Sequence, residues 1–246
     1  MGIVEIEHLT FAYSAGRTIL NDISLSLDEC ENVGLIGANG VGKSTILKLM
    51  VGLIGNYHGR LSINGLNVEK KNYTAIREQT GYVFQDPDSQ LFLPTVYEDV
   101  AFGPRNYGYS EQEVDRRVME ALRKVHMEEL KDRQIYKMSG GQKKLASIAT
   151  ILSLKPELLL LDEPSVTLDP RNRRNLIHIL NEMEGTKVIA AHDLDLILDT
   201  CKRTILLAGG KIVRDGATEE ILRDKKLLEE SGLELPLSVS GQERYF

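Results

Sequence analysis

Hydrophobic and polar residues alternate over the first thirty positions of the chain. In residues 4–13 the alternation has a period of two, and in residues 19–27 the apolar side chains fall largely on one face: Ile19, Ile23, Leu25 and Leu27. A period of two is typical of a β-strand with one buried face. The beginning of the chain is therefore predicted to form β-structure.

Short, continuous apolar runs follow, and they are typical of strands buried on both faces of a parallel sheet. They lie at residues 33–36, 82–84, 158–161, 188–191 and 204–207. The first run leads into a glycine-rich loop, and a helix is predicted after it over residues 44–53. The pattern predicts an α/β fold.

Between residues 84 and 156 the apolar period becomes helical. Ser110 and Glu113 have the spacing of a capping box, and they precede an apolar stripe at i, i+4, i+8 and i+11, formed by Val114, Val118, Leu122 and Val125. A second helix is predicted after Ser139, with Leu145, Ile148 and Leu152 on one face. We interpret residues 86–155 as a helical insertion, and we expect the chain beyond residue 232 to be loosely ordered.

Composition narrows the class of protein. A chain of 246 residues is long enough for one substantial α/β core with an inserted subdomain. Its formal net charge of −6 disfavours a nucleic-acid partner. Its two cysteines, Cys30 and Cys201, have no metal-ligand spacing. No run reaches the roughly 18 apolar residues that span a bilayer, so a role at a membrane would require a partner protein.

The first chemical motif is the glycine-rich loop, residues 37–44. It matches the pattern G-x-x-x-x-G-K-[ST] in full, with Lys43 and Ser44 at its end. Its glycines let backbone N–H groups turn toward phosphates, Lys43 supplies a positive charge, and the Ser44 hydroxyl can bind Mg²⁺. The strand before the loop and the helix after it disfavour a chance glycine-rich turn. The loop alone also fits a kinase or a GTPase.

Two acids follow the four-leucine run at residues 158–161. In open α/β sheets ligands bind at the carboxyl ends of the strands, so Asp162 and Glu163 are placed for chemistry. Asp162 can hold the Mg²⁺ shell, and Glu163 can take a proton from an attacking water. Without the phosphate loop, the same residues would read as a pair of surface acids.

The segment Ser139-Gly140-Gly141-Gln142 has the spacing of a capping box at the start of a helix. Two glycines in a first helical turn each cost about 1 kcal/mol relative to alanine. A helix tolerates them where a ligand must approach its amide groups closely, and a phosphate is the obvious candidate.

These motifs together resemble the ATP-binding-cassette (ABC) ATPases over nearly the whole chain. Residues 37–44 resemble the Walker A loop, 138–142 the signature and 158–163 Walker B. The resemblance implies ATP and Mg²⁺ as cofactors, with Gln85, Ser44 and Asp162 at the metal. It also implies catalytic roles for Glu163, Gln85 and His192. The implied nucleotide-binding residues are Tyr13, Gly37, Ala38, Asn39, Gly40, Val41, Gly42, Lys43, Ser44, Thr45, Ser139, Gly140, Gly141 and Gln142. Without the family, Tyr13 reads as a packing residue and His192 as a structural histidine.

The resemblance also implies an architecture and partners. We expect a P-loop (RecA-like) parallel-sheet core with an N-terminal antiparallel β subdomain. The ATPase domain would span residues 1–232, with a helical subdomain at about 86–155 and a short tail at 233–246. A second ATPase subunit, identical or different, would supply the signature across a dimer. Transmembrane subunits would dock near residues 86–92, through exposed Leu91 and Phe92, at the cytoplasmic face of the membrane. No nucleic-acid partner is expected.

Residues 84–92, 95–104 and 232–236 are similar to those of the ATPases of energy-coupling-factor importers, which take up cobalt, nickel or vitamins. The alternatives are an ABC importer or exporter of another group, a soluble ABC ATPase acting on nucleic acid, and a catalytically silent cassette.

Some positions depart from the family. Met138, Leu145 and Thr150 are unusual in and after the signature, and Val166-Thr167 replaces the usual Ala-Gly of the D-loop (residues 165–169), which leaves the contacts across a dimer open.

Overall fold

The amino-terminal sheet is antiparallel. The computed structural model describes residues 2–13 and 16–243, the last three of these as backbone only. The sheet has the strand order β2 (Thr18–Leu27), β1 (Val4–Ala12), β4 (His58–Ile63) and β5 (Leu66–Asn67). The predicted antiparallel β subdomain is confirmed, although β4 and β5 come from a segment in which no strand was predicted.

The second sheet has six strands and is mostly parallel. Its order is β10 (Lys211–Ala217), β9 (Arg203–Ala208), β3 (Asn32–Gly37), β8 (Thr186–Ala190), β7 (Leu158–Asp162) and β6 (Thr80–Val83). Strands β9, β3, β8, β7 and β6 pair in parallel, and β10 pairs antiparallel to β9. The carboxyl ends of the parallel strands therefore meet at one edge of the sheet.

Apolar side chains cover both faces of this sheet. In β7, Leu158 and Leu160 belong to the cluster shared with α1 and the antiparallel sheet, whereas Leu159 and Leu161 belong to the cluster shared with the helices on the other face. This explains the continuous apolar runs in the sequence, since a strand buried on both faces needs no polar alternation.

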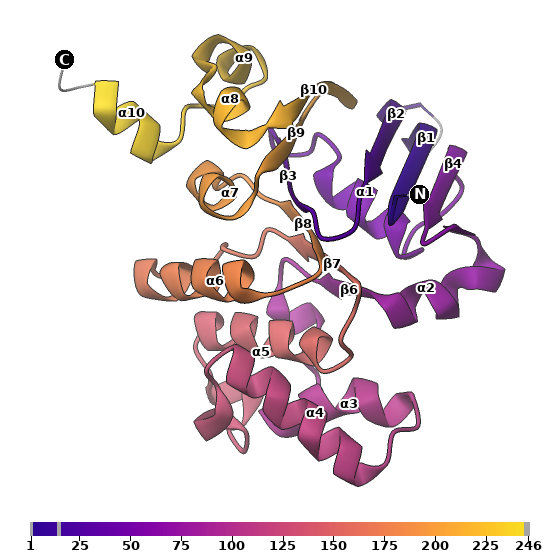
Figure 1. Ribbon diagram of the computed structural model, residues 1–246, viewed down its shortest axis with the longest axis vertical. Helices are drawn as coiled ribbons and strands as arrows, with labels where there is room; N and C mark the ends of the chain where they lie inside the picture. Colours follow the sequence, from indigo (N-terminus) through magenta and orange to yellow (C-terminus); the bar gives the residue numbers. More distant parts are fainter. Residues whose placement is uncertain (1, 14–15, 244–246) are drawn as a thin grey trace.

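Helices surround the sheet (Figure 1). They are α1 (Lys43–Met50), α2 (Tyr73–Gln79), α3 (Val96–Asn106), α4 (Glu111–Lys124), α5 (Gly140–Leu152), α6 (Pro170–Glu182), α7 (Leu194–Thr200), α8 (Thr218–Arg223), α9 (Lys225–Glu230) and α10 (Leu237–Glu243). Short 3-10 turns lie at Lys70–Asn72, Pro87–Ser89, Glu128–Leu130 and Ile135–Lys137.

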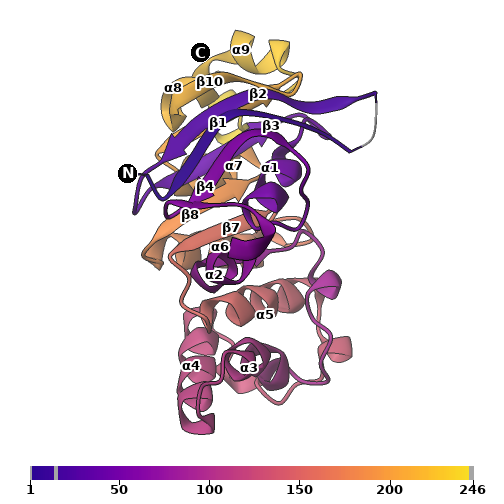
Figure 2. The ribbon, with the colours of Figure 1, turned by 90° about the vertical axis from the view of Figure 1, so that its right-hand side faces the viewer.

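Helices α3, α4 and α5 form a layer at the end of the molecule opposite the antiparallel sheet (Figures 1 and 2). The Ser110 side chain accepts a hydrogen bond from Glu113 N at the start of α4, as predicted. The carboxylate of Glu113, however, accepts from Arg116 and Arg117. Ser139 and Gln142, by contrast, form a full reciprocal capping box at the start of α5.

The carboxyl-terminal segment differs from the prediction of loose order. Residues Leu237–Glu243 form α10, and the Asp195 carboxylate at the start of α7 accepts hydrogen bonds from Leu237 N (3.0 Å) and Ser238 N (3.1 Å). Over residues 237–243 the prediction was wrong because the capping carboxylate lies 42 residues earlier in the chain, where a local pattern cannot reveal it. Residues 244–246, to which the prediction also applied, lie outside the described residues.

Candidate functional site

The glycine-rich loop joins β3 to α1 at the carboxyl edge of the sheet. Gly42 caps α1 with φ of 116°, and a Cβ there would lie 2.6 Å from Leu20 Cδ2. Only glycine satisfies both conditions at this position. The buried Lys43 ammonium, whose side chain is 6% exposed, donates to Gly37 O at 2.7 Å. The loop thus holds a positive charge beneath the N-terminus of a helix, an arrangement that attracts phosphate.

Asp162 ends β7 beside this loop. Its Oδ1 accepts a hydrogen bond from Ser44 Oγ at 2.7 Å, and its Oδ2 accepts one from Tyr82 Oη at 2.9 Å. Burial, and then the neighbouring Asp162 carboxylate, raise the pKa of Tyr82, so its phenol stays protonated and donates. Sequence reasoning missed this role of Tyr82, whose only signal is a hydroxyl in an apolar strand.

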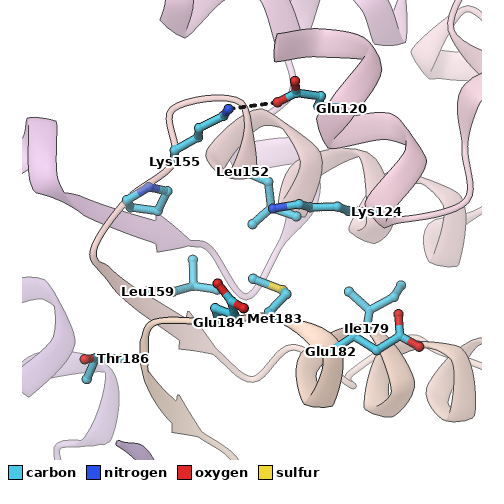
Figure 3. A pocket seen from close by; sticks show the side chains of 11 residues that line it. Glu120, Lys124, Leu152, Lys155, Leu159, Ile179, Glu182, Met183, Glu184 and Thr186 are labelled. Carbon is cyan, nitrogen blue, oxygen red and sulfur yellow. Dashed lines mark ion pairs between the residues drawn. The ribbon is translucent and has the colours of Figure 1, made fainter. Parts of the chain in front are cut away.

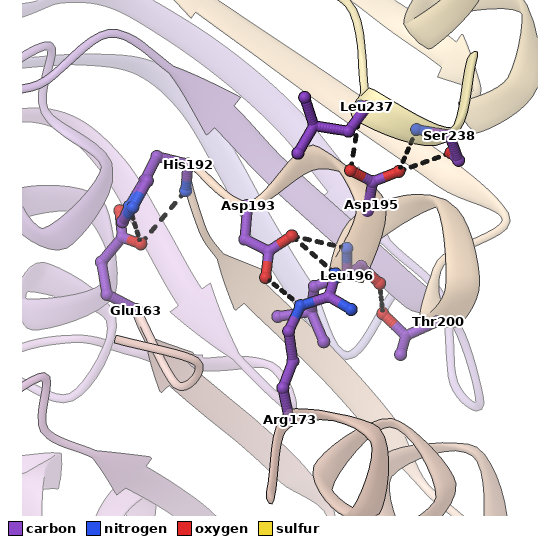
Figure 4. Close-up of polar contacts among 9 residues, drawn as sticks. All are labelled: Glu163, Arg173, His192, Asp193, Asp195, Leu196, Thr200, Leu237 and Ser238. Carbon is purple, nitrogen blue, oxygen red and sulfur yellow. Dashed lines mark hydrogen bonds and ion pairs between the residues drawn. The ribbon is translucent and has the colours of Figure 1, made fainter. Parts of the chain in front are cut away.

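Glu163 and His192 meet at the same edge of the sheet, as the resemblance to the ABC ATPases implied. Glu163 Oε2 accepts from His192 N at 3.1 Å and lies 2.7 Å from His192 Nδ1 (Figure 4). Glu163 Oε1 lies 3.6 Å from Lys43 Nζ. The Glu163 backbone takes the left-handed φ of 46°, and its N donates to Ala190 O at 2.8 Å. One buried carboxylate therefore contacts both a lysine ammonium and a half-exposed imidazole.

Of these groups, Lys43, Ser44, Glu163 and His192 line one open pocket of about 530 Å³. Tyr13 stands at its margin, 59% exposed, with its hydroxyl 3.2 Å from Thr45 Oγ1. The exposed Gln85 also lines the pocket, as do Val166 and Ile19, which the sequence did not place at the nucleotide site. The full lining is Tyr13, Ile19, Asn39, Gly40, Gly42, Lys43, Ser44, Thr45, Gln85, Glu163, Val166 and His192. The size suits a small-molecule ligand.

The signature segment, Ser139–Gln142, is not among the described residues that line this pocket. Ser139 and Gln142 form the predicted capping box at the start of α5. A Cβ on Gly141 would lie 3.0 Å from Asn172 Nδ2, so close packing within the chain accounts for this glycine. Gly140 is exposed, and a Cβ on it would lie 3.7 Å from Thr167 Oγ1.

The D-loop residue Thr167 takes φ of 77°. A β-branched residue with a left-handed backbone is an outlier, and such strain costs on the order of 1–3 kcal/mol. The glycine that usually stands in the family motif would adopt this conformation freely. The departure noted in the sequence is therefore a strained residue beside the signature.

The residues after Gln85 differ from the expectation that Leu91 is exposed. Leu91 is 6% exposed and belongs to the core of the helical layer, because the 3-10 turn at Pro87–Ser89 directs it inward. The neighbouring Phe92 is 65% exposed, as expected, and its ring makes an edge-to-face contact with Phe102 at a centroid distance of 4.9 Å.

Further polar contacts lie beside His192 and at the carboxyl-terminal helix (Figure 4). The adjacent Asp193 carboxylate receives two hydrogen bonds from the Arg173 guanidinium, at 2.6 and 2.7 Å, and caps α7 at Leu196 N. The Arg173 guanidinium and the Leu196 amide lower the pKa of Asp193 against the opposing effect of burial. Asp193 thus stays ionised and fixes the loop that carries His192.

The oxygen donors at the pocket fit a magnesium ion. Mg²⁺ prefers oxygen ligands and is usually held by one or two carboxylates together with substrate phosphates. Ser44 Oγ and Asp162 Oδ1, 2.7 Å apart, offer such a pair, and Gln85 lines the same pocket. Within residues 2–13 and 16–243, no cluster of three or more His, Cys, Asp or Glu side chains has the geometry of a metal site.

No helix in the part of the chain that the structure describes has the length and apolarity needed to cross a bilayer.

Comparison with known proteins identifies the family. Residues 20–166, well over half of the chain, match the model of the ABC transporter family. A putative ABC transporter ATP-binding protein of Gloeobacter violaceus is 45% identical over 236 residues, which cover 95% of this chain and 97% of the relative. The energy-coupling factor transporter ATP-binding protein of Carboxydothermus hydrogenoformans is 42% identical over 239 residues, covering 96% and 88%.

A solved structure matches this chain over nearly the whole length of both. The structure of cbiO1 from Clostridium perfringens, described as part of the ABC transporter complex cbiONQ, has a TM-score of 0.84 and 34% identity. The match covers 98% of this chain and 99% of that one. The chain therefore belongs to the ABC transporter family, as an ATP-binding subunit whose ATP hydrolysis is coupled to transport.

Proposed function

We propose that the chain is the ATP-hydrolysing subunit of an energy-coupling-factor importer for a metal ion or a vitamin. The observation that carries the ATPase chemistry is the meeting of Lys43, Ser44, Glu163 and His192 at one pocket. Asp162 accepts a hydrogen bond from the Ser44 hydroxyl of that pocket. The importer subgroup is supported by the energy-coupling factor relative and by the resemblance of residues 84–92 and 95–104.

In this proposal each residue at the pocket has a distinct role. Lys43 contacts the β- and γ-phosphates, Tyr13 stacks on the adenine, and Glu163 takes a proton from the attacking water. His192, held by the Glu163 carboxylate, lies where it reaches the γ-phosphate. Mg²⁺ held by Ser44, Asp162 and Gln85 would neutralise charge on the phosphates.

A second subunit completes the site. Ser139–Gln142 do not line their own chain's pocket within the described residues, and their helix N-terminus offers amides to an anion. The proposed dimer places this segment of one subunit against the ATP of the other. The two subunits are either two copies of this chain or this chain with a sister ATPase.

The proposed docking surface for the membrane subunits consists of the exposed residues of the segment 86–92 together with Phe102. Phe92 and Phe102, 65% and 42% exposed, form a small aromatic patch, in which Phe92 lies seven residues after Gln85. Leu91 is buried and is therefore not part of the contact. A membrane helix seated there would be within a few residues of the γ-phosphate site, at the cytoplasmic face of the membrane.

The test replaces Phe92 and Phe102 with aspartate in a tagged copy of the protein in its native cells. We expect loss of the protein from the membrane fraction and loss of uptake of Co²⁺, Ni²⁺ or a vitamin. The isolated variant should keep its ATP hydrolysis. Val213→Asp, on the exposed strand β10, is the matched control because Val213 is 45% exposed in another part of the molecule. Undiminished association of the double variant would place the docking surface elsewhere, and a wild-type protein absent from membranes would contradict the importer proposal.

A further inference from the structure

Lys144 lies five residues after Ser139, inside α5, and its side chain is fully buried at 0% exposure. Its ammonium donates to two backbone carbonyls of the segment that carries the pocket glutamine: Phe84 O at 2.8 Å and Gln85 O at 2.6 Å. The helix that begins with the signature therefore holds the backbone of Gln85 directly.

A buried ammonium with only neutral acceptors is unfavourable. Burial lowers the pKa of Lys144 to about 8, against the opposite influence of the Asp162, Asp86 and Glu163 carboxylates. A methionine would cover similar apolar surface without this desolvation penalty. What the lysine adds is its pair of hydrogen bonds to Phe84 and Gln85.

Gln90 makes a second link between the same segment and the same helix. Its Oε1 accepts from Phe84 N at 3.1 Å, while its Nε2 donates to Ser147 O at 2.7 Å and to Thr150 Oγ1 at 2.8 Å. Both backbone polar groups of Phe84 are thus tied to α5, one through Lys144 and one through Gln90. Residues 84–90 cannot shift along α5 without breaking these partly buried hydrogen bonds.

A third contact is weaker. Lys143 Nζ lies 2.6 Å from Asp88 Oδ1, but the Asp88 side chain is 62% exposed. Exposed ion pairs contribute little because solvent screens them. Lys143 is therefore a natural control for Lys144, being its neighbour on the same helix and bonded to the same segment from the surface.

We propose that Lys144 is a positioning residue that couples the signature helix to Gln85. Because Ser139–Gln142 and Lys144 belong to the first turns of one helix, a phosphate bound at its N-terminus fixes Lys144 and, through it, the backbone of Gln85. Each subunit would thereby adjust its own metal- and water-contacting glutamine to the nucleotide engaged by its signature. This inference rests on the proposed dimer with shared ATP.

The first test follows hydrogen exchange in the Glu163→Gln background, with Mg²⁺ and ATP. ATP should protect the amides of residues 37–45 in every variant, and those of residues 84–90 only where Lys144 is present. Lys144→Met should lose the second protection and keep the first, Lys144→Arg should regain part of it, and Lys143→Met should behave as the parent.

The second test is kinetic and uses wild-type Glu163. Lys144→Met should lower kcat for ATP hydrolysis by about 10- to 100-fold, the range for a misplaced catalytic group. The ATP concentration at half-maximal rate should change by less than about twofold, because the phosphate loop is untouched. Replacing a residue with a purely structural role would change both kcat and the ATP concentration at half-maximal rate, or neither of them.

The outcomes separate the inference from the function beneath it. If residues 37–45 gain no protection with ATP, the proposed ATPase site fails. If they are protected and residues 84–90 respond equally with and without Lys144, the coupling is refuted. Should Lys144→Met not fold, Gln90→Leu, at a half-buried position, provides the same readout with a smaller expected loss, and wild-type protection in that variant overturns the proposal.

Discussion

The carboxyl and amino edges of the six-stranded sheet both collect lysine and carboxylate side chains beside a cavity. At the carboxyl edge, Lys43, Asp162 and Glu163 are at most 6% exposed, and each contacts a defined partner. At the amino edge, the cavity between α4, α5 and α6 carries its charges on the rim (Figure 3). The Glu120–Lys155 pair there is 2.8 Å long, but its side chains are 33% and 45% exposed.

The two cavities are of similar size, about 530 and 440 Å³. They differ in how deeply their charged side chains are buried and in whether those side chains contact defined partners. The amino-edge floor is apolar, with Leu152, Leu159 and Met183, and its acids and lysines face solvent. Water screens charges in that position. At the carboxyl edge, low exposure strengthens each electrostatic contact. The contrast can be tested by making the same kinds of substitution at both edges.

The largest effect is expected for Glu163→Gln. The amide keeps the size of the side chain and loses the proton acceptor, so hydrolysis should slow by roughly 10²- to 10⁴-fold. ATP binding should persist, and an ATP-bound dimer should accumulate on size exclusion. Phosphate release and equilibrium ATP binding measure the two effects.

The matched control lies at the other end of the same strand. Glu157 precedes β7 at the amino edge and accepts a hydrogen bond from Asn64 Nδ2 at 2.7 Å. Glu157→Gln should leave hydrolysis within about twofold of wild type, since surface substitutions act weakly. Equal losses of hydrolysis in Glu157→Gln and Glu163→Gln would remove the distinction between the two edges. Near-normal turnover of Glu163→Gln would show that Glu163 is not the base.

How much the sequence predicts also differs between regions. The phosphate loop, Asp162 and Glu163 were predicted to lie together because a strand end and one continuous loop fix their positions, and the resemblance to the ABC ATPases added His192; the structure brings all of them to one edge of the sheet. Their catalytic roles stay predictions. The contacts of Tyr82, Gln90 and Lys144 were not predicted, because each joins residues about 60 to 80 positions apart or crosses between a turn and a helix.

Leu91 shows why a short polar stretch misleads. Its neighbours suggested an exposed turn, yet the 3-10 turn rotates it into the core while the buried Asp99 carboxylate accepts from Phe92 N and Leu93 N. Exposure at such a turn depends on a rotation set by the folded helical layer, and the local pattern does not contain it.

A smaller effect, on stability, is expected from Lys187 near the amino end of β8. It is 2% exposed and donates to Met183 O, and burial lowers its pKa against the opposing influence of Cys201 and Cys30. Between its lowered pKa and its unfolded value of about 10.4, the unfolded chain binds more protons. The contribution of Lys187 to the free energy of unfolding therefore rises with pH in that window.

Lys187→Met should remove this pH dependence. Relative to wild type, the variant should be most stable near pH 7, and its advantage should shrink as the pH rises toward 10. Urea unfolding of both proteins across this pH range measures the difference. Burial raises the pKa of Cys201 to about 11, so this thiol stays mostly protonated in the window. A difference that is constant with pH would show that the buried amine does not titrate as its environment requires.

The smallest effect is expected at Lys124, on the rim of the amino-edge cavity (Figure 3). Its side chain is exposed at the last residue of α4, where a positive charge interacts favourably with the helix dipole but is screened by solvent. Lys124→Ala should change the free energy of unfolding by no more than about 0.5 kcal/mol and leave ATP hydrolysis unchanged. Urea unfolding and phosphate release test both expectations. A large loss of hydrolysis with intact stability would mean that the amino-edge cavity takes part in the ATP cycle, and burial would then no longer separate the working edge of the sheet from the other.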